Sequence, residues 1–391
     1  MKLTAALLAS AGLAGLAGTA LGHSELEKPL YVAEYGVDQG RCHDPAKPCR
    51  TISYALQRVG KGGQVRVATG SYEIDDVRDL FHMVSAVVNV RGGYDARNGF
   101  QQPTARASTL VGVPREYRAM LASRGFHVIA DRKTIDRDVI VETERLLALQ
   151  SKLQSNTLSA APCVGGTSGG LACENAELLA HVSLNEVSAQ PAGAMDIWGF
   201  VDLNTGREYA IVGYQTGTGV FDITDAENPL EVGFIDGAAA GWRDIKVHQF
   251  FNAAQGRWNA YAYVTTDLSS DGLFIIDLSG LPHSVSRQSY ASDFSQAHNV
   301  FISNVDFSTG LSLTGASPSL IVAGSNNGSG RFRLYSLANP AAPAFVAIPG
   351  SATYMHDAAS MIIRDSRKDT QCVLAVDYCE VLFDFSEDAV E

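Results

Sequence analysis

Residues Met195–Val247 read MDIWGFVDLNTGREYAIVGYQTGTGVFDITDAENPLEVGFIDGAAAGWRDIKV, and this stretch decides the fold. It contains three short apolar runs, Tyr209–Gly213, Gly219–Ile223 and Leu230–Ile235, separated by Gly, Asn, Asp and Pro. Runs of four to six residues rich in Val, Ile, Tyr and Phe between such turn formers are typical of β-strands. With Asp196–Val201 as a first strand, the stretch predicts one four-stranded antiparallel unit.

The same unit then recurs along the chain. Its signature Phe221-Asp222-Ile223 returns in three related segments, Ile276-Asp277-Leu278, Leu334-Tyr335-Ser336 and Phe383-Asp384-Phe385. The starts of the units also align, at Asp196, Asp244, Asn299 and Asp357, roughly every 50 to 60 residues. Four-stranded units at this spacing indicate propeller blades. We therefore expect a mainly β chain, with a β-propeller of about four four-stranded units over residues 161–391.

How such a ring would close is open at this point. Leu178–Leu184 lies before Asp196 where an outer, fourth strand would lie, and the last unit shows three strands, including Val373–Asp377 and Val381–Phe385. Propellers often complete one blade with strands from both ends of the domain, because this protects exposed edges. We expect Leu178–Leu184 to pair beside Val381–Phe385. The alternative is an incomplete propeller, a piece of a longer one.

The beginning of the chain predicts export. Met1 to Gly22 carries one lysine, then an Ala-, Leu- and Gly-rich run with small residues at its end, as in a secretory signal peptide. No later stretch is long and apolar enough to span a bilayer. The composition is acidic, with 30 Lys+Arg against 42 Asp+Glu and no basic block, so nucleic acid is an unlikely class of partner.

Six cysteines form three pairs that are close in sequence. In an exported chain, an even number of locally paired cysteines predicts disulfides rather than metal sites. The expected pairs are Cys42 with Cys49, Cys163 with Cys173, and Cys372 with Cys379. The last pair is open, because a hairpin turn at Asp377-Tyr378 would carry Cys379 away from Cys372.

Residues 23–134 predict a separate α+β module. Thr51–Val59 is a short amphipathic helix with Thr51 at its N-cap, and Gln64–Ala68 follows as a strand. Pro48-Cys49-Arg50-Thr51-Ile52 and the later Gly70-Ser71-Tyr72 resemble the first-coil segment of pectin-lyase-like, right-handed parallel β-helix proteins. The module has room for only two or three coils, too few for a lyase platform. Residues 135–160 follow as a helical linker.

A second resemblance covers residues 163–391. Its motifs are Cys163-Val164-Gly165-Gly166, Asp196-Ile197-Trp198-Gly199-Phe200, Glu208-Tyr209-Ala210-Ile211-Val212-Gly213 and Trp242-Arg243-Asp244-Ile245-Lys246. Together they resemble the choice-of-anchor B family of exported proteins with LVIVD repeats. The resemblance implies a β-propeller outside the cell or at its surface, with no established catalytic activity. The chain departs from the family at Ser360, where members usually carry a Cys.

Five residues are candidates for chemistry in the propeller channel. The first strand of a blade lines the channel, and the alignment of the units places there Asp196, Asp244, His298, His356 and Asp357. Carboxylates and imidazoles converging on an axis are suitable ligands for a divalent metal, the one cofactor the pattern suggests. The alternative, which we favour, is that they hydrogen-bond the backbone of neighbouring blades. No nucleophilic triad or phosphate loop is evident.

These observations favour a secreted or cell-surface binding protein without catalytic activity or cofactor. Its partner would be a protein or a glycan held by the propeller loops. The alternative is a metal-dependent hydrolase or lactonase that acts in the channel. A metal bound among the five candidate residues would distinguish the two.

Overall fold

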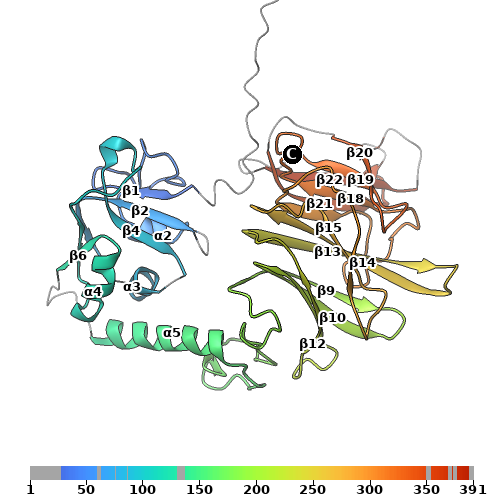
Figure 1. Cartoon of the computed structure of the whole chain (residues 1–391), viewed down its shortest axis with the longest axis horizontal. Helices are drawn as coiled ribbons and strands as arrows, with labels where there is room; N and C mark the ends of the chain where they lie inside the picture. Colours follow the sequence, from blue (N-terminus) through green and yellow to red (C-terminus); the bar gives the residue numbers. More distant parts are fainter. Residues whose placement is uncertain are drawn as a thin grey trace, which may run out of the picture.

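The computed structural model describes residues 28–59, 63–74, 76–85, 87–129, 137–348, 354–368, 372 and 377–386. The predicted signal peptide at residues 1–22 lies outside the described residues. The chain is mainly β and forms two lobes, with the N-terminal module on the left of Figure 1 and a succession of antiparallel sheets on the right. A single long helix, α5 (Arg137–Ser155), runs along the underside between them.

The N-terminal module contains two parallel three-stranded sheets. One has the order β1-β2-β4 and the other β3-β5-β6. The strands are β1 (Leu30–Val32), β2 (Gln64–Ala68), β3 (Ser71–Glu73), β4 (Asn89–Tyr94), β5 (Ser108–Val111) and β6 (Phe126–Ile129). The helices are α2 (Ile52–Leu56), α3 (Val77–Val84), α4 (Arg118–Ser123) and the short 3-10 turns η1 (Ala96–Asn98) and η2 (Arg115–Tyr117). The Thr51 hydroxyl caps α2 by accepting the Tyr54 N–H at 3.1 Å.

Helix α5 contributes to the packing of both lobes. Val139 and Leu147, two turns apart on one face, pack against the core of the N-terminal module. Leu146, Leu149 and Leu153 occupy a neighbouring face that points toward the first sheet of the other lobe. Beyond α5, a small hairpin of β7 (Thr167–Ser168) and β8 (Leu171–Ala172) precedes that sheet.

Four antiparallel sheets follow, each built from consecutive strands as the repeats predict. The first has β9 (Ala194–Asp202), β10 (Arg207–Tyr214), β11 (Gly217–Asp222) and β12 (Leu230–Asp236). The second has β13 (Trp242–Asn252), β14 (Arg257–Asp267), β15 (Phe274–Asp277) and β16 (Ser286–Gln288). The third has β17 (Asn299–Ile302), β18 (Ser319–Ala323), β19 (Arg333–Ser336) and β20 (Ala344–Ala347). The last has β21 (Met355–Ile363) and β22 (Cys379–Ser386).

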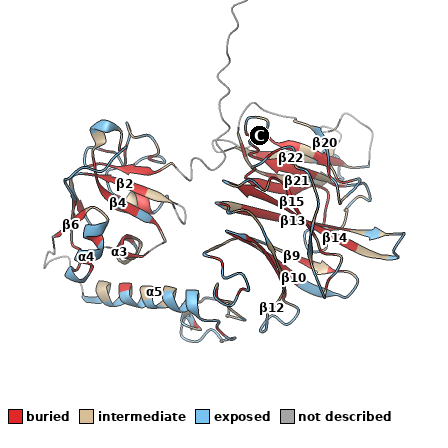
Figure 2. Ribbon diagram, viewed as in Figure 1, coloured by how far each residue is buried: buried red, intermediate tan, exposed pale blue. Residues whose placement is uncertain are grey.

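Successive sheets pack face to face through apolar side chains. Their first strands lie side by side, β9 against β13, β13 against β17 and β17 against β21. Ile211 of the first sheet shares a core with Val264 of the second, and Tyr263 on the opposite face of β14 shares the next core with Val322 of the third. Figure 2 shows these buried strands stacked through the right-hand lobe. Alternation along β14 thus supplies two interfaces at once.

The predicted pairing of Leu178–Leu184 with Val381–Phe385 is wrong. Within the described residues β22 pairs with β21, for example Phe383 with Ala359, whereas Leu178 and His181 pair with Ala161 and Leu158. The physical reason is packing, because Val182 and Leu184 cover apolar side chains on the outer face of the first sheet.

The last unit also differs from its prediction of three successive strands. Strand β21 pairs directly with β22, without a strand between them. Most of the predicted middle strand, residues 373–376, lies outside the described residues.

The three cysteine pairs predicted from the sequence are all at disulfide distance. The Cα–Cα separations are 5.4 Å for Cys42–Cys49, 6.0 Å for Cys163–Cys173 and 5.7 Å for Cys372–Cys379. The last pair, left open from the sequence, is therefore joined. These disulfides are compatible with an exported protein. Among the described helices, none combines the length and apolar character that crossing a bilayer requires.

Candidate functional site

The first strands of the four sheets bring the five candidate channel residues onto neighbouring elements. Asp196 lies on β9, Asp244 on β13, and both His356 and Asp357 on β21, whereas His298 directly precedes β17. Because these strands contact one another in order, the alignment of the repeats placed the residues correctly.

The two aspartates hold adjacent sheets together in the same way. Asp196 Oδ2 accepts the N–H of Ile245 at 3.3 Å, and Asp244 Oδ2 accepts the N–H of Val300 at 2.7 Å. Each acceptor therefore reaches the equivalent amide one sheet further on. Asp244 Oδ1 also accepts its neighbour's N–H at 2.8 Å and the Lys246 ammonium at 2.5 Å. These are structural bonds of the kind that buried polar groups require.

The electrostatics of this cluster are balanced within it. Burial raises the pKa of the Asp244 carboxyl, the nearby Lys246 ammonium opposes that rise, and Asp196 adds to it. Lys246 also lies 3.9 Å from Asp196 and 4.5 Å from the centre of the Trp198 ring. The ammonium is therefore shared among groups of two strands.

At the third joint a pair of histidines lies next to the position that the aspartates occupy in the other joints. His298 Nε2 lies 3.1 Å from His356 Nε2, and His298 Nδ1 lies 3.7 Å from Asp267 Oδ2. Burial lowers the pKa of His356, which favours its neutral form. Asn299, in the position of the aspartates, accepts from the Trp242 indole N–H at 2.9 Å and donates to the His356 carbonyl at 3.1 Å.

For a metal, this arrangement offers two imidazole nitrogens and little else. A carboxylate near the second nitrogen of one histidine is a common feature of metal-binding histidines. Asp357 Oδ1, however, accepts the N–H of Ala358 at 2.7 Å. Within the described part of the chain, no three His, Cys, Asp or Glu side chains are arranged to hold one ion. Asp196 and Asp244 of this cluster bond the backbone of the next sheet.

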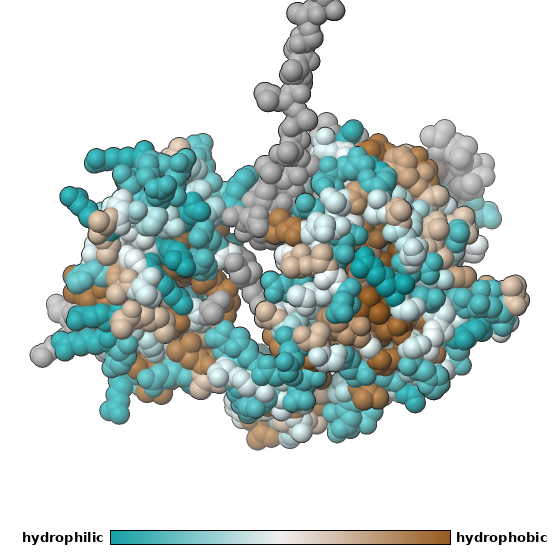
Figure 3. Space-filling view, in the orientation of Figure 1, coloured by the Kyte–Doolittle hydropathy of each residue, from teal (hydrophilic) through white to brown (hydrophobic). Residues whose placement is uncertain are grey.

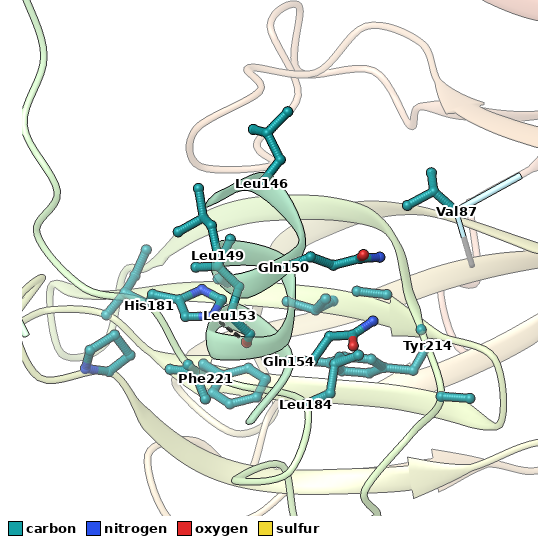
Figure 4. A pocket seen from close by; sticks show the side chains of 18 of the residues that line it. Val87, Leu146, Leu149, Gln150, Leu153, Gln154, His181, Leu184, Tyr214 and Phe221 are labelled. Carbon is teal, nitrogen blue, oxygen red and sulfur yellow. Dashed lines mark hydrogen bonds between the residues drawn. The ribbon is translucent and has the colours of Figure 1, made fainter. Parts of the chain in front are cut away.

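A large apolar cavity lies elsewhere, between α5 and the outer face of the first sheet (Figure 4). Its volume is about 660 Å³. Leu146, Leu149 and Leu153 of α5 form one wall. The opposite wall consists of sheet side chains, namely Ala210, Val212, Tyr214, Phe221 and Ile223. Val182 and Leu184 line one side, and Phe81 and Val87 reach the cavity from the N-terminal module.

Four polar side chains interrupt this apolar lining. His181 is already engaged, since its Nε2 lies 2.8 Å from the Leu153 carbonyl. Gln150, Gln154 and Tyr214 also line the cavity, and Figure 4 shows both glutamines on the side of α5 that faces Tyr214. Burial, followed by the charge of Glu231, raises the pKa of Tyr214 to about 12. Its hydroxyl is therefore neutral at physiological pH.

The sequence analysis did not identify this cavity, although one signal for it was present. Tyr209–Gly213 is apolar at every position, and a strand with one face in water would alternate instead. Tyr209 and Ile211 pack toward the second sheet, which leaves Ala210 and Val212 to face a further layer. The covering layer is α5, which propensity alone could not place there.

A second, polar hollow of about 600 Å³ lies among loops of the second and third sheets. Hydroxyl, amide and carboxylate groups line it, from Ser270, Asp271, Ser292, Asp293, Asn326 and Asn327, together with Phe294 and Ser295. Asp293 pairs with Arg333 and accepts the Tyr335 hydroxyl at 2.6 Å. Hydrophilic residues also cover most of the face of the molecule seen in Figure 3. This hollow is the loop region that best fits a polar partner.

Comparison with known proteins gives no identity, since neither a protein-family model nor a curated protein matches the chain.

Proposed function

We propose that this chain is an exported or cell-surface binding protein without catalytic activity, whose four sheets are blades of an LVIVD-type β-propeller. The observation that carries the proposal is the cavity beneath α5. Ligand sites are typically concave, mostly apolar and about 300–1,000 Å³, with a few polar groups that orient the ligand. The cavity, at about 660 Å³, has these properties. The aspartates of the inner strands, by contrast, are engaged in bonds between sheets.

The polar hollow supports a partner at the loops as part of the same function. Its hydroxyl and amide groups are the groups that bind a glycan or the polar surface of a protein. The cavity would then hold a small molecule and the loops a larger partner.

The test is binding of Nile red, an uncharged apolar dye, to the full chain. We expect saturable binding that Val212→Phe weakens, because the larger side chain fills space over the sheet. Val141→Phe is the matched control, since Val141 is 57% exposed on α5 and does not line the cavity. Failure of the wild-type chain to bind the dye, or equal binding by both variants, would overturn the proposal.

A metal-dependent hydrolase or lactonase is the second candidate, and the paired imidazoles of His298 and His356 favour it. Metal analysis of protein purified without chelators tests it. One equivalent of a divalent metal that is lost in His356→Ala would support this candidate, and metal-free protein would contradict it.

A further inference from the structure

The structure assigns a ligand class to the cavity. We propose that it binds an uncharged, elongated amphiphile, an apolar chain ending in one hydroxyl or carbonyl group, and that Gln150, Gln154 and Tyr214 recognise that group. This inference rests on the proposed function, because it names the ligand of the same site.

The first reason to expect an uncharged ligand is the charge of the residues that line the cavity. No Asp, Glu, Lys or Arg is among the residues that line the cavity, and His181 Nε2 is hydrogen-bonded to the Leu153 carbonyl. A carboxylate or ammonium placed there would lose its hydration without gaining a counter-charge, which is costly. Charged ligands of either sign are therefore disfavoured.

The second reason concerns the polar side chains of the lining, which indicate a hydroxyl or carbonyl group on the ligand. No hydrogen bond to another described residue engages the side-chain amides of Gln150 and Gln154 or the Tyr214 hydroxyl; Tyr214 is 5% exposed, Gln150 is half-buried and Gln154 is exposed. The two glutamines are four residues apart and so share one face of α5. An amide both donates and accepts, and a phenol does the same. Such groups match a hydroxyl or carbonyl, and a ligand that supplies one would satisfy them.

The third reason is the shape of the cavity, which indicates an elongated ligand. The lining follows α5 from Leu146 to Gln154, about 12 Å of helix at the usual rise per residue. Side chains of the first sheet, among them Val212 and Phe221, also line the cavity. A space of about 660 Å³ that extends along a helix suits one extended chain better than a compact polar molecule.

The test uses three competitors of equal chain length, dodecanol, dodecanoate and dodecylammonium, to displace Nile red from the full chain. At about pH 8 the carboxylate and the ammonium are both charged. We expect dodecanol to displace the dye at a concentration at least about tenfold lower than either charged competitor, since desolvating a charge is unfavourable. Equal displacement by dodecanoate and dodecanol would overturn the ligand class.

A variant that adds a positive charge to the cavity makes the test independent of the solubility of each competitor. Gln150→Lys places an ammonium at the polar group of the cavity, so dodecanoate should become the stronger competitor. Ser151→Lys is the control, because it adds the same charge at an exposed neighbouring position outside the lining. Tyr214→Phe should weaken dodecanol about two- to tenfold, the usual effect of losing one neutral hydrogen bond.

The outcomes separate this inference from the proposed function. If neither the wild-type protein nor any variant binds Nile red, the proposed function fails. If the dye binds but Gln150→Lys leaves the preference for dodecanol unchanged, the assignment of the ligand class fails and the binding function stands. Thermal unfolding of each variant shows that the fold is retained.

Discussion

Replacing Asp244 with alanine should destabilise the stacked sheets, and the structure sets the magnitude. The carboxylate is 4% exposed and accepts the N–H groups of Ile245 and Val300 as well as the Lys246 ammonium. Each buried amide left without an acceptor costs about 1–3 kcal/mol. Lys246 is partly exposed and can turn toward water. The Val300 amide loses this acceptor, whereas the Ile245 amide keeps Asp196 Oδ2, so we expect a loss of about 2 kcal/mol in the free energy of unfolding.

Asp196→Ala is the matched control, because Asp196 has the same role one sheet earlier but in a wetter site. Its side chain is 27% exposed, its bond to the Ile245 amide is 3.3 Å long, and Lys246 is 3.9 Å away. Its loss should therefore cost about 1 kcal/mol or less. Urea denaturation followed by tryptophan fluorescence measures both variants. Equal costs for the two would refute the reasoning that the Asp244 bonds hold the second and third sheets together.

Two further predictions concern stability. Burial lowers the pKa of His248, whose Nδ1 donates to the Gly310 carbonyl at 2.9 Å. The stabilisation from its neutral form is complete above the unfolded value of about 6.5 and is lost as the pH falls through the lower folded value. His248→Asn keeps a hydrogen-bond donor but has no titratable group. The unfolding free energy of this variant should therefore fall less than that of the wild type as the pH is lowered below about 6.5. The same pH profile for both proteins would argue against this. Cys163→Ala should cost about 2–3 kcal/mol at most, because the loop closed with Cys173 is short. Non-reduced peptide mapping that shows a free thiol at Cys173 in the wild type would contradict that expectation.

The repeats predicted the strands well because each strand carries its own local signal. The turn residues around Asn204-Thr205-Gly206 and the apolar runs beside them are readable without knowledge of the partners. The aligned aspartates were found for the same reason, since Asp196 and Asp244 occupy one position in equivalent units. The alignment also placed His298 and His356 on neighbouring strands, where they meet.

Which element each segment packs against was harder to predict, because it depends on which faces of the sheets remain uncovered. Leu178–Leu184 has the composition of an outer strand, and nothing in its pattern distinguishes an edge from a covering segment. Its apolar side chains Val182 and Leu184 instead pack against Tyr214 and Phe221. The cavity was missed for a related reason, since it requires α5 and β10, which are distant in sequence, to be placed together.

The carboxylate-to-amide bonds between sheets also bear on how the number of sheets can change in evolution. Asp196 and Asp244 make the same bond to the following unit, so the first and second joints are interchangeable. A tandem duplication of the segment from Asp244 to His298 would present each new copy with the acceptor it needs. The third joint differs, because Asn299 donates to the His356 carbonyl there. We expect gain or loss of sheets to be tolerated before that joint and to require compensating substitutions after it.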